Sequence, residues 1–273
     1  MISRDLFDLK GTKILFSGAT GVLGTSMALY LAQQGAELLL LGRTPEKVNA
    51  LRDQITAEGG KASGYYADVT DEESLEKVKT LIESQHGSIA VLINAAGGNM
   101  PGAVIRPEQT FLDLDNDALR QVMDLNYLGT VFPVKVFLPL LLKNGGGTIL
   151  NISSMAASRP MTRVVGYASA KAAIDNLTKW LAVELASKHG PSFRVNALAP
   201  GFFLTEQNRT LLTQEDGSLT QRGTQIIGHT PMNRFGNPDD LLGALHWLCS
   251  DASKFVTGTT VAVDGGFSAY SGV

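Results

Sequence analysis

A tyrosine and a lysine four residues apart, Tyr167 and Lys171, have side chains that together can move a proton. On a helix they would lie one above the other on the same face. A free tyrosine holds its proton until about pH 10, and a neighbouring ammonium group favours the phenolate form. The pair predicts an acid or base that works nearer neutral pH. The spacing also arises by chance in many helices, so this prediction depends on what the rest of the chain brings to the pair.

A glycine-rich turn near the start of the chain lies between a predicted strand and a predicted helix. Residues 13–17 form a short apolar run that is typical of a buried parallel strand, and residues 25–34 form an amphipathic segment. Between them stand Gly18, Gly21 and Gly24. Glycine lets the backbone amides at a helix N-terminus approach a phosphate closely. The turn predicts a dinucleotide site, although tight turns also use glycine for steric reasons alone.

The end of the second predicted strand indicates which dinucleotide would bind. A carboxylate at this position would bind the ribose hydroxyls of NAD. Here Gly42 has no side chain, and Arg43 offers a guanidinium suited to a 2′-phosphate. This pattern favours NADP(H), with NAD(H) as the alternative. An arginine that simply solvates a strand end would look the same.

Strands and helices alternate along the whole chain, without an internal repeat or a break in composition. The predicted strands are residues 13–17, 36–41, 64–67, 89–93, 148–152, 194–198 and 259–263, and the main predicted helices are residues 25–34, 45–58, 71–85, 114–142, 167–188 and 238–250. This pattern predicts one α/β domain over residues 1–273, a Rossmann-type, doubly wound parallel sheet of about seven strands with helices on both faces. Residues 202–236 form a polar excursion, which we expect to be a substrate lid.

Composition excludes several kinds of partner. The 273 residues carry a net charge of −3 and no basic stripe, which argues against nucleic acid and anionic membranes. The single cysteine, Cys249, cannot form an internal disulfide, which indicates a reducing cytoplasm. No apolar run approaches the roughly 18 residues of a membrane span. His229 and His246 lack acidic residues at metal-binding spacing, so we expect both to be structural and expect no metal site.

Taken together and in order, the motifs resemble the short-chain dehydrogenase/reductase superfamily over nearly the whole chain. The residues that carry the resemblance are Gly18, Gly21, Gly24, Asp68, Asn94, Ala95, Gly97, Asn126, Ser154, Tyr167, Lys171, Pro200, Gly201 and Thr205. The glycine spacing is nearer to the longer epimerase and dehydratase branch, whereas the length and later motifs follow the short branch. Segments 97–101, 200–209, 229–232 and 265–273 resemble a narrower group, the D-mannonate oxidoreductases, also called fructuronate reductases.

The resemblance implies an NAD(P)H-dependent oxidoreductase that transfers hydride between nicotinamide and a carbonyl or secondary alcohol. Tyr167 would be the acid/base, and Ser154 would hold the carbonyl oxygen. Lys171 would lower the pKa of Tyr167 and bind the nicotinamide ribose. Asn126 would hold a water that links Lys171 to solvent. The implied cofactor-binding residues are Gly18, Thr20, Gly21, Leu23, Gly24, Arg43, Asp68, Val69, Asn94, Ala95, Gly97, Tyr167, Lys171, Pro200 and Thr205.

The substrate is the least determined part of the prediction. A sugar acid needs a cation for its carboxylate and polar groups for its hydroxyls. Candidate substrate residues are Asn99, Arg159, Arg163, Phe203, Gln207, Asn208 and Arg209. Each arginine has a plain alternative as a surface residue, and Phe202 with Phe203 would also suit a steroid or acyl chain.

Several other functions remain open from the sequence. A gluconate-type dehydrogenase or a 3-ketoacyl reductase would share the same motifs. A cofactor-retaining isomerase or lyase, and a non-catalytic dinucleotide sensor or scaffold, are alternatives of other classes. Members of the superfamily are commonly homotetramers, which implies pairing through the helices that begin near Asp115 and Tyr167, with the apolar tail 267–273 at another interface.

Overall fold

A seven-stranded parallel sheet forms the centre of the computed structural model, which describes residues 5–205 and 208–272. The strands are β1 (Lys13–Ser17), β2 (Glu37–Gly42), β3 (Lys61–Tyr66), β4 (Val91–Asn94), β5 (Gly147–Ile152), β6 (Phe193–Pro200) and β7 (Thr260–Val263). Their order in the sheet is β3-β2-β1-β4-β5-β6-β7. The order reverses between β1 and β4, and ligands of such sheets bind at the carboxyl ends of the strands beside this reversal. The predicted doubly wound sheet is confirmed.

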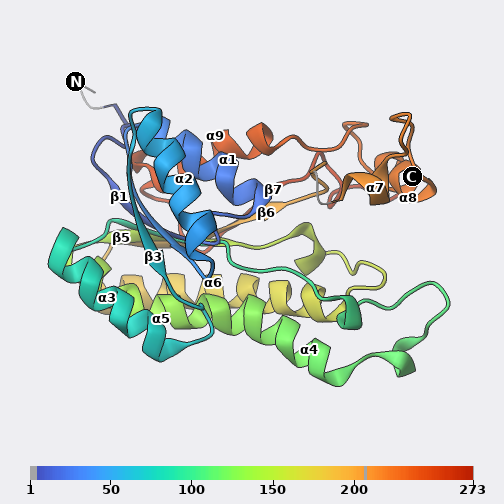
Figure 1. Ribbon diagram of the computed structural model, residues 1–273, viewed down its shortest axis with the longest axis horizontal. Helices are drawn as coiled ribbons and strands as arrows, with labels where there is room; N and C mark the ends of the chain where they lie inside the picture. Colours follow the sequence, from blue (N-terminus) through green and yellow to red (C-terminus); the bar gives the residue numbers. More distant parts are fainter. Residues whose placement is uncertain (1–4, 206–207, 273) are drawn as a thin grey trace.

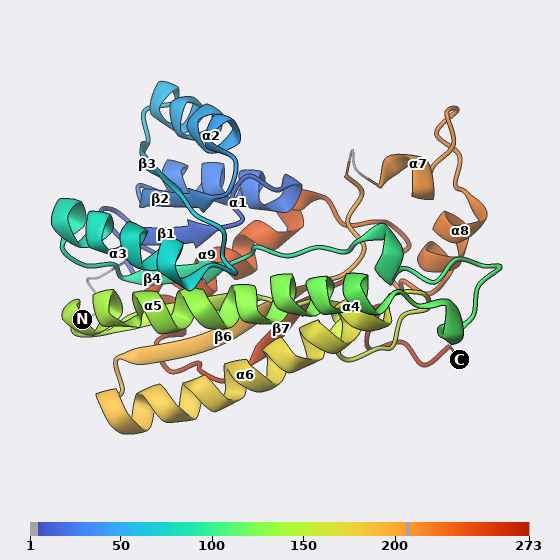
Figure 2. The ribbon, with the colours of Figure 1, turned by 60° about the horizontal axis from the view of Figure 1, so that its bottom comes forward.

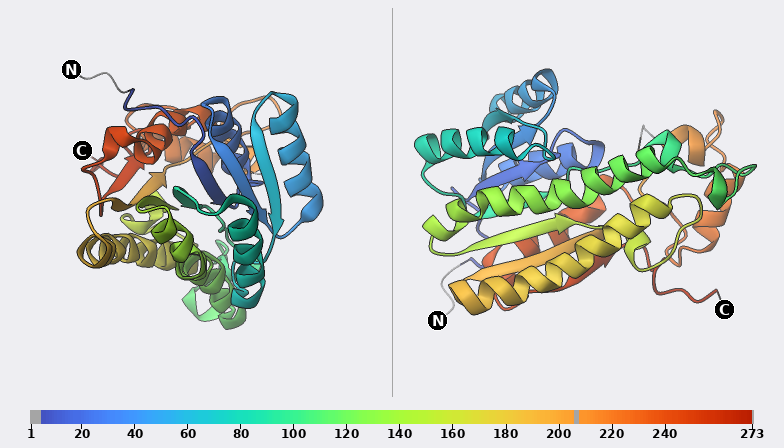
Figure 3. Two further views of the ribbon diagram at one scale, coloured as in Figure 1. Left: turned by 90° about the vertical axis from the view of Figure 1, so that its left-hand side faces the viewer. Right: turned by 90° about the horizontal axis from the view of Figure 1, so that it is seen from below.

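Helices cover both faces of the sheet (Figures 1 and 3). The described helices are α1 (Val22–Gln33), α2 (Pro45–Ala57), α3 (Glu72–His86), α4 (Asn116–Met123), α5 (Gly129–Lys143), α6 (Val165–His189), α7 (Arg209–Leu212), α8 (Gln221–Gly228) and α9 (Leu242–Cys249). Helices α1, α2 and α9 lie on one face, and α3, α5 and α6 on the other. Phe16 packs toward the first group and Leu15 toward the second, because successive strand side chains point to opposite faces. Burial on both faces explains why the strands are continuously apolar.

One helical run, close in length to the helix expected over residues 114–142, is strongly apolar. Helices α4 and α5 are joined by a π-helical turn, Asp124–Leu128, into a run of 28 residues with mean hydropathy 1.6. By length and composition alone, this run could cross a membrane. We had expected no apolar run of membrane-spanning length. Half of its apolar window is buried inside the protein, where α5 packs on α3 and β4. The run therefore has the properties of a core helix.

The segments after β4, β5 and β6 gather at the carboxyl edge of the sheet (Figure 2). The excursion at 202–236 is more ordered than its composition indicates, since it contains α7 and α8, joined in part by a bridge between Thr213 and Leu219. The end of the chain returns to the same edge, where the Met232 amide donates to the Gly265 carbonyl oxygen at 3.0 Å. The excursion and the chain end thus flank one side of the site described next.

Candidate active site

The structure brings Ser154, Tyr167 and Lys171 together at the carboxyl edge of the sheet. Tyr167 lies in the first turn of α6, and Lys171 one turn further on. The Nζ atom of Lys171 is 5.6 Å from the centroid of the Tyr167 ring and donates a hydrogen bond of 2.8 Å to the carbonyl oxygen of Ile152. Ile152 ends β5, and the hydroxyl of Ser154, two residues later, is hydrogen-bonded to that of Tyr167. The three predicted catalytic side chains therefore lie together where β5 ends and α6 begins.

Burial controls the protonation of this group. It raises the pKa of Tyr167 above its ordinary value, and the hydrogen bond with Ser154 offsets only part of that rise. Burial also lowers the pKa of Lys171 to about 8, against the opposing charge of Asp175 one turn later. The net shift of the Tyr167 pKa is upward because loss of water around the phenol has the largest effect, and the expected lowering by Lys171 stays a prediction. Tyr167 therefore holds its proton at neutral pH, as a proton donor must.

Asn126 lies in the π-helical turn between α4 and α5 and is fully buried. Its Nδ2 atom donates to the Gly98 carbonyl oxygen at 2.7 Å, and its Oδ1 atom accepts from the Gly98 amide at 3.1 Å. Asparagine competes for backbone hydrogen bonds inside helices, and π-turns occur often at functional sites. The widened turn thus lets Asn126 fasten the loop after β4 with its side chain.

Gly97 allows that loop to pass close to the catalytic side chains. A Cβ atom at Gly97 would lie 2.6 Å from Oδ1 of Asn126 and 3.3 Å from Nζ of Lys171. Ala95 anchors the start of the loop, because its amide donates to the Ser17 carbonyl oxygen at 3.0 Å. The backbone of this loop, predicted to support the cofactor, therefore runs directly beside Lys171.

Asn94 lies at the end of β4, where the loop predicted to support the cofactor begins. Its side chain is 2 % exposed, and its Nδ2 atom donates to Oδ1 of Asn151 on β5 at 3.0 Å. Asn151 in turn donates to the hydroxyl of Thr178 on α6 at 2.9 Å. Burial between strands keeps the Asn94 side chain away from a ribose. Its contribution is to join β4, β5 and α6 beneath the site.

The glycine turn after β1 leaves room for a phosphate group. Gly18 has a φ of +76°, a conformation that side chains rarely adopt, and a Cβ atom at Gly24 would lie 2.4 Å from the Gly18 carbonyl oxygen. Gly21 is exposed, and no side chain caps the N-terminus of α1. Thr20 and Leu23, beside it, are partly exposed. Uncovered amides at a helix N-terminus suit the pyrophosphate of a dinucleotide.

Arg43 and Asp68 lie at the ends of β2 and β3 and form an ion pair. The guanidinium is 3.3 Å from the carboxylate, and the Arg43 side chain is 64 % exposed. Burial tends to raise the pKa of Asp68, but hydrogen bonds from Thr70 and the charge of Arg43 together lower it. Val69 is buried and contacts the backbone of α5 near Gly129. Arg43 thus lies at the strand end where a cofactor ribose would lie.

Hydrogen bonds join the described residues that follow β6. Pro200 ends β6 and is buried. The Thr205 amide donates to Oδ1 of Asn208, and Nδ2 of Asn208 donates to the Phe203 carbonyl oxygen, both at 2.8 Å. Asn208 was predicted to contact substrate. Its amide group instead satisfies the turn that presents Thr205.

Other residues predicted to bind substrate also have contacts within the protein, and their role in substrate binding stays a prediction. The Nε atom of Arg159 donates to the Ser268 carbonyl oxygen at 2.8 Å, so this arginine fastens the chain end. Phe203 is 5 % exposed and belongs to the core on the α1 and α9 side. The exposed Asn99 accepts a hydrogen bond from the next backbone amide. Gln207 lies outside the described residues.

Two predicted arginines are exposed, and a third arginine is partly buried. Arg209 begins α7 and is exposed. Arg163 is exposed and has a φ of +74°. Arg222, on α8, was not selected from the sequence, yet burial lowers its pKa and the charge of Arg163 lowers it further. The N-cap residue Thr220 was a local sign of α8, but no local pattern linked Arg222 to a loop some 60 residues earlier.

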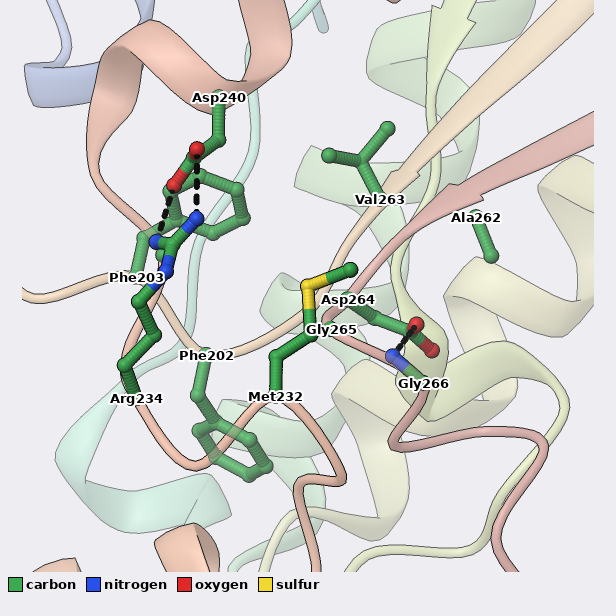
Figure 4. A pocket seen from close by; sticks show the side chains of 11 residues that line it. Phe202, Phe203, Met232, Arg234, Asp240, Ala262, Val263, Asp264, Gly265 and Gly266 are labelled. Atoms are coloured by element: carbon green, nitrogen blue, oxygen red, sulfur yellow. Dashed lines mark hydrogen bonds and ion pairs between the residues drawn. The ribbon is translucent and has the colours of Figure 1, made fainter.

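A cavity of about 350 Å³ lies beside the site, at the ends of β6 and β7 (Figure 4). Arg234 faces Asp240 in it through two hydrogen bonds of 2.6 and 2.9 Å, and the carboxylate of Asp264 accepts from the Gly266 amide at 2.9 Å. Its lining residues are Phe202, Phe203, Met232, Arg234, Gly236, Asp240, Ala262, Val263, Asp264, Gly265 and Gly266. Ser154, Tyr167 and Lys171 do not line this cavity. Arg234 pairs with Asp240, and the Asp264 carboxylate is held by backbone amides.

The two histidines named in the sequence analysis make hydrogen bonds within the protein, and the cysteine is buried. His246 bonds to the Tyr30 hydroxyl at 2.9 Å and to the Phe7 carbonyl oxygen at 2.6 Å. His229 bonds to a carbonyl oxygen of its own helix. Burial raises the pKa of Cys249 to about 12, so its thiol behaves as a small core group.

Comparison with known proteins identifies the family of this chain. The family model described as enoyl-(acyl carrier protein) reductase matches residues 18–268. UxuB, an uncharacterised oxidoreductase of Bacillus subtilis, is 47 % identical over 97 % of this chain and 98 % of its own.

Two solved structures extend the comparison. A Haemophilus influenzae protein with bound NAD, provisionally assigned as a D-mannonate oxidoreductase, is 42 % identical over 97 % of this chain and 98 % of its own, with a TM-score of 0.92. Gluconate 5-dehydrogenase of Burkholderia cenocepacia, in complex with NADP and tartrate, is 30 % identical over 97 % of this chain and 98 % of its own, with a TM-score of 0.85. The chain therefore belongs to the short-chain dehydrogenase/reductase family of NAD(P)-dependent oxidoreductases.

Proposed function

We propose that this oxidoreductase interconverts a keto group and a secondary alcohol on a sugar acid of the fructuronate and D-mannonate type. The observation that carries the chemistry is the hydrogen-bonded corner formed by Ser154, Tyr167 and Lys171. The substrate class is supported by 42 % identity to the Haemophilus influenzae protein and by the exposed Arg163 and Arg209, which lie in the loop before Tyr167 and in the excursion.

Bound nicotinamide supplies the hydride, and the side chains manage the proton. The Tyr167 hydroxyl donates its proton to the carbonyl oxygen of the substrate, and the Ser154 hydroxyl donates a hydrogen bond to the same oxygen. The Lys171 ammonium holds the ribose next to the nicotinamide and supports negative charge on Tyr167 during the reaction. Asn126 fastens the loop after β4 and holds a water beside Lys171, through which the proton of Tyr167 is replaced.

We further propose that NADPH is preferred over NADH. The exposed guanidinium of Arg43, held at the end of β2 by Asp68, supports binding of a 2′-phosphate. The glycine turn at 18–24, Val69, Ala95, Gly97, Pro200 and Thr205 complete the cofactor site in this proposal. The side chain of Asn94 is replaced in that role by the backbone that follows it.

A panel of keto acids and keto sugars tests both proposals. Purified protein is mixed with fructuronate, keto-gluconates, a 3-ketoacyl thioester and a keto steroid, each with NADH and NADPH, and the absorbance of the reduced cofactor is followed. We expect the highest kcat/KM with fructuronate and NADPH. Good reduction of the other carbonyls without the keto-uronates would overturn the substrate, and product formation without net cofactor consumption would indicate an isomerase or lyase.

The single domain of residues 1–273, the lid and the assembly complete the proposal. The excursion at 202–236 would close over the substrate. Trp180 and Val183 on α6 are 59 % and 70 % exposed, and Leu112 before α4 is 93 % exposed, which supports pairing of these helices in a homotetramer. A monomeric mass by light scattering would contradict the tetramer. The buried, uncharged thiol of Cys249 is compatible with the cytoplasm, which fractionation of cells tests.

A further inference from the structure

The two ends of the excursion are bonded to each other where they leave the sheet. Phe203 and Gly236 form an isolated parallel bridge. The Gly236 amide donates to the Phe202 carbonyl oxygen at 2.8 Å, and the Leu204 amide donates to the Gly236 carbonyl oxygen at 3.0 Å. A Cβ atom at Gly236 would lie 2.7 Å from the Phe203 ring, so this contact requires glycine. The excursion is therefore a closed loop, and residues 202–204 and 236 form its base.

This base lies at the ends of β6 and β7, one strand away from Ser154. The Gly201 amide donates to the Val263 carbonyl oxygen at 3.0 Å, which joins the end of β6 to the end of β7. The Ser153 amide, next to Ser154, donates to the Leu198 carbonyl oxygen of β6 at 2.8 Å. The position of the base therefore determines where α7 and α8 lie relative to the strand end that carries Ser154.

An ion pair fastens the base to the segment that follows it. Arg234 donates to both carboxylate oxygens of Asp240, at 2.6 and 2.9 Å, and to the Phe235 carbonyl oxygen at 3.0 Å. Asp240 also accepts from the Asn237 amide at 2.8 Å. Exposed ion pairs usually contribute little, but a guanidinium that forms two parallel bonds to one carboxylate fixes the orientation of both groups. The hydrogen bond from Arg234 is the largest cause that lowers the pKa of Asp240 to about 2, so the carboxylate stays charged at neutral pH.

The segment that carries Asp240 is firmly held. Asp240 belongs to a short 3-10 helix, Pro238–Leu241, which leads directly into α9. Leu241 is fully buried and belongs to the same core cluster as Met27 and Leu31 of α1. Helix α1 begins at the glycine turn predicted to bind the cofactor. The ion pair thus connects the base of the excursion to a segment packed on the predicted cofactor-binding helix.

The same ion pair lines the cavity at the ends of β6 and β7. Figure 4 shows Arg234 and Asp240 facing each other beside Phe203. The cavity of about 350 Å³ leaves this side of the base without continuous packing, whereas protein interiors are normally close-packed. Without the ion pair, the base would therefore have space into which it could shift.

We propose that Arg234 and Asp240 are a positioning pair that holds the excursion where it can bind the carbonyl substrate beside Tyr167. This inference rests on the proposed function, because it takes the excursion to cover the substrate. It adds the contact that sets the place of the excursion. The two residues act through the base at 202–204 and 236, and they touch neither the substrate nor the cofactor.

Steady-state kinetics with fructuronate and NADPH test the pair. The proteins are the wild type, Arg234→Gln, Arg234→Lys, Asp240→Asn and the double variant of Arg234→Gln with Asp240→Asn. The control, Arg52→Gln, breaks the ion pair of Arg52 with Asp53 on α2. We expect Arg234→Gln to raise KM for fructuronate about 5- to 20-fold, because a contact with two charge-assisted bonds is lost. The kcat and the Kd for NADPH should stay within about threefold of wild type.

The double variant and the lysine variant show whether the two residues act as a pair. The double variant should have a KM within about twofold of Arg234→Gln, because both single changes remove the same contact. Arg234→Lys should recover part of the loss, since it keeps the charge but cannot form two parallel bonds. Independent, multiplying effects of the two single changes on KM would overturn the pair.

Hydrogen–deuterium exchange gives a second readout that needs no substrate. The amides of Leu204, Met232 and Gly236 are hydrogen-bonded at or near the base. Peptides that contain them should exchange at least about threefold faster in Arg234→Gln, whereas peptides from α1 and β5 should not change. Arg52→Gln should match the wild type in all of these peptides.

The outcomes separate this inference from the proposed function. A wild type that reduces fructuronate, with an unchanged KM in Arg234→Gln, overturns the positioning pair and leaves the proposed function standing. Equal losses of substrate and NADPH binding also overturn the pair, since the change would then act on the whole fold. A wild type that reduces no keto acid overturns the proposed substrate, and unchanged exchange in Arg234→Gln then overturns the pair as well. If Arg234→Gln proves unfolded by thermal denaturation, Arg234→Lys decides, because a wild-type KM in that variant overturns the pair and a KM at least about threefold higher supports it.

Discussion

The Lys171 ammonium donates a hydrogen bond of 2.8 Å to the carbonyl oxygen of Ile152. This bond ties the second turn of α6 to the last residue of β5. Tyr167 is one turn before Lys171, and Ser154 is two residues after Ile152. This buried hydrogen bond therefore holds the helix turn that follows Tyr167 against the strand end that precedes Ser154.

The first prediction concerns the stability cost of burying Lys171. Its pKa of about 8 in the folded protein is below the value of about 10.4 in an unfolded chain. Between these values the unfolded state binds a proton that the folded state has released, so this group makes stability rise with pH from about 8 to 10.4. Below pH 8 the burial costs about 3 kcal/mol. We expect Lys171→Met to abolish activity yet unfold at higher urea concentration at pH 7, with a smaller advantage at pH 9.5.

The control for that experiment is Lys77→Met, which changes an exposed lysine on α3. It should show no gain at pH 7. A Lys171→Met protein whose stability relative to wild type is the same at both pH values would contradict the low pKa of Lys171.

The second prediction concerns Tyr167 as the proton donor. Tyr167→Phe removes the hydroxyl and keeps the ring, so we expect kcat to fall at least about 100-fold, the usual contribution of general acid catalysis. Cofactor affinity, measured by fluorescence of the bound reduced nicotinamide, should change less than about threefold, because Lys171 still holds the ribose. Tyr66→Phe, at an exposed tyrosine on β3, serves as the matched control. Retained turnover in Tyr167→Phe would refute the mechanism.

The third prediction separates two adjacent glycines. Gly97→Ala places a Cβ atom 2.6 Å from Asn126 and 3.3 Å from Lys171, so the loop must shift. Gly98→Ala meets no atom within 4 Å. We expect Gly97→Ala to lower kcat/KM at least about 10-fold, because small displacements of positioning groups have large effects on rate. Gly98→Ala should remain near wild type, and similar kinetics in the two variants would show that the loop tolerates the added atom.

The fourth prediction addresses the choice of cofactor. Arg43→Gln removes the positive charge beside Asp68, so we expect KM for NADPH to rise about 10-fold while KM for NADH changes less than about twofold. Steady-state kinetics with both cofactors provide the measurement, with Arg52→Gln as the control. Equal changes for the two cofactors would mean that Arg43 acts on the strand end and not on a 2′-phosphate.

Local pattern was enough to predict most of the fold. The apolar runs at 13–17 and 148–152 are strands because burial on both faces requires continuous apolar sequence. Gly24 is needed because it packs against the Gly18 carbonyl oxygen within the same turn, and Gly18 is needed because the backbone of Ala95 and Ala96 passes close to it. The observed helix boundary differs from the predicted one where no side chain caps the N-terminus of the helix. Helix α6 begins at Val165, two residues before its predicted start, without a capping side chain.

Contacts between distant segments were not predictable in the same way. Arg159 finds its partner at Ser268, 109 residues later, and no local feature of the loop indicates this. Asn94 looked like a ribose ligand because it follows a central strand, yet its neighbour Asn151 turns it into the sheet. Arg222 was missed for the converse reason, since its relation to Arg163 exists only after the excursion folds back.

The chain end has a practical consequence for anyone who handles this enzyme. Asp264 accepts from the amides of Gly266 and Ser268, Ser268 accepts from Arg159, and Tyr270 stacks edge-on with His229 at a centroid distance of 6.3 Å. The end of the chain thus contacts both the loop before Tyr167 and the excursion. A purification tag or a truncation there would disturb the loop before Tyr167 and the excursion at once, so fusions belong at the opposite terminus.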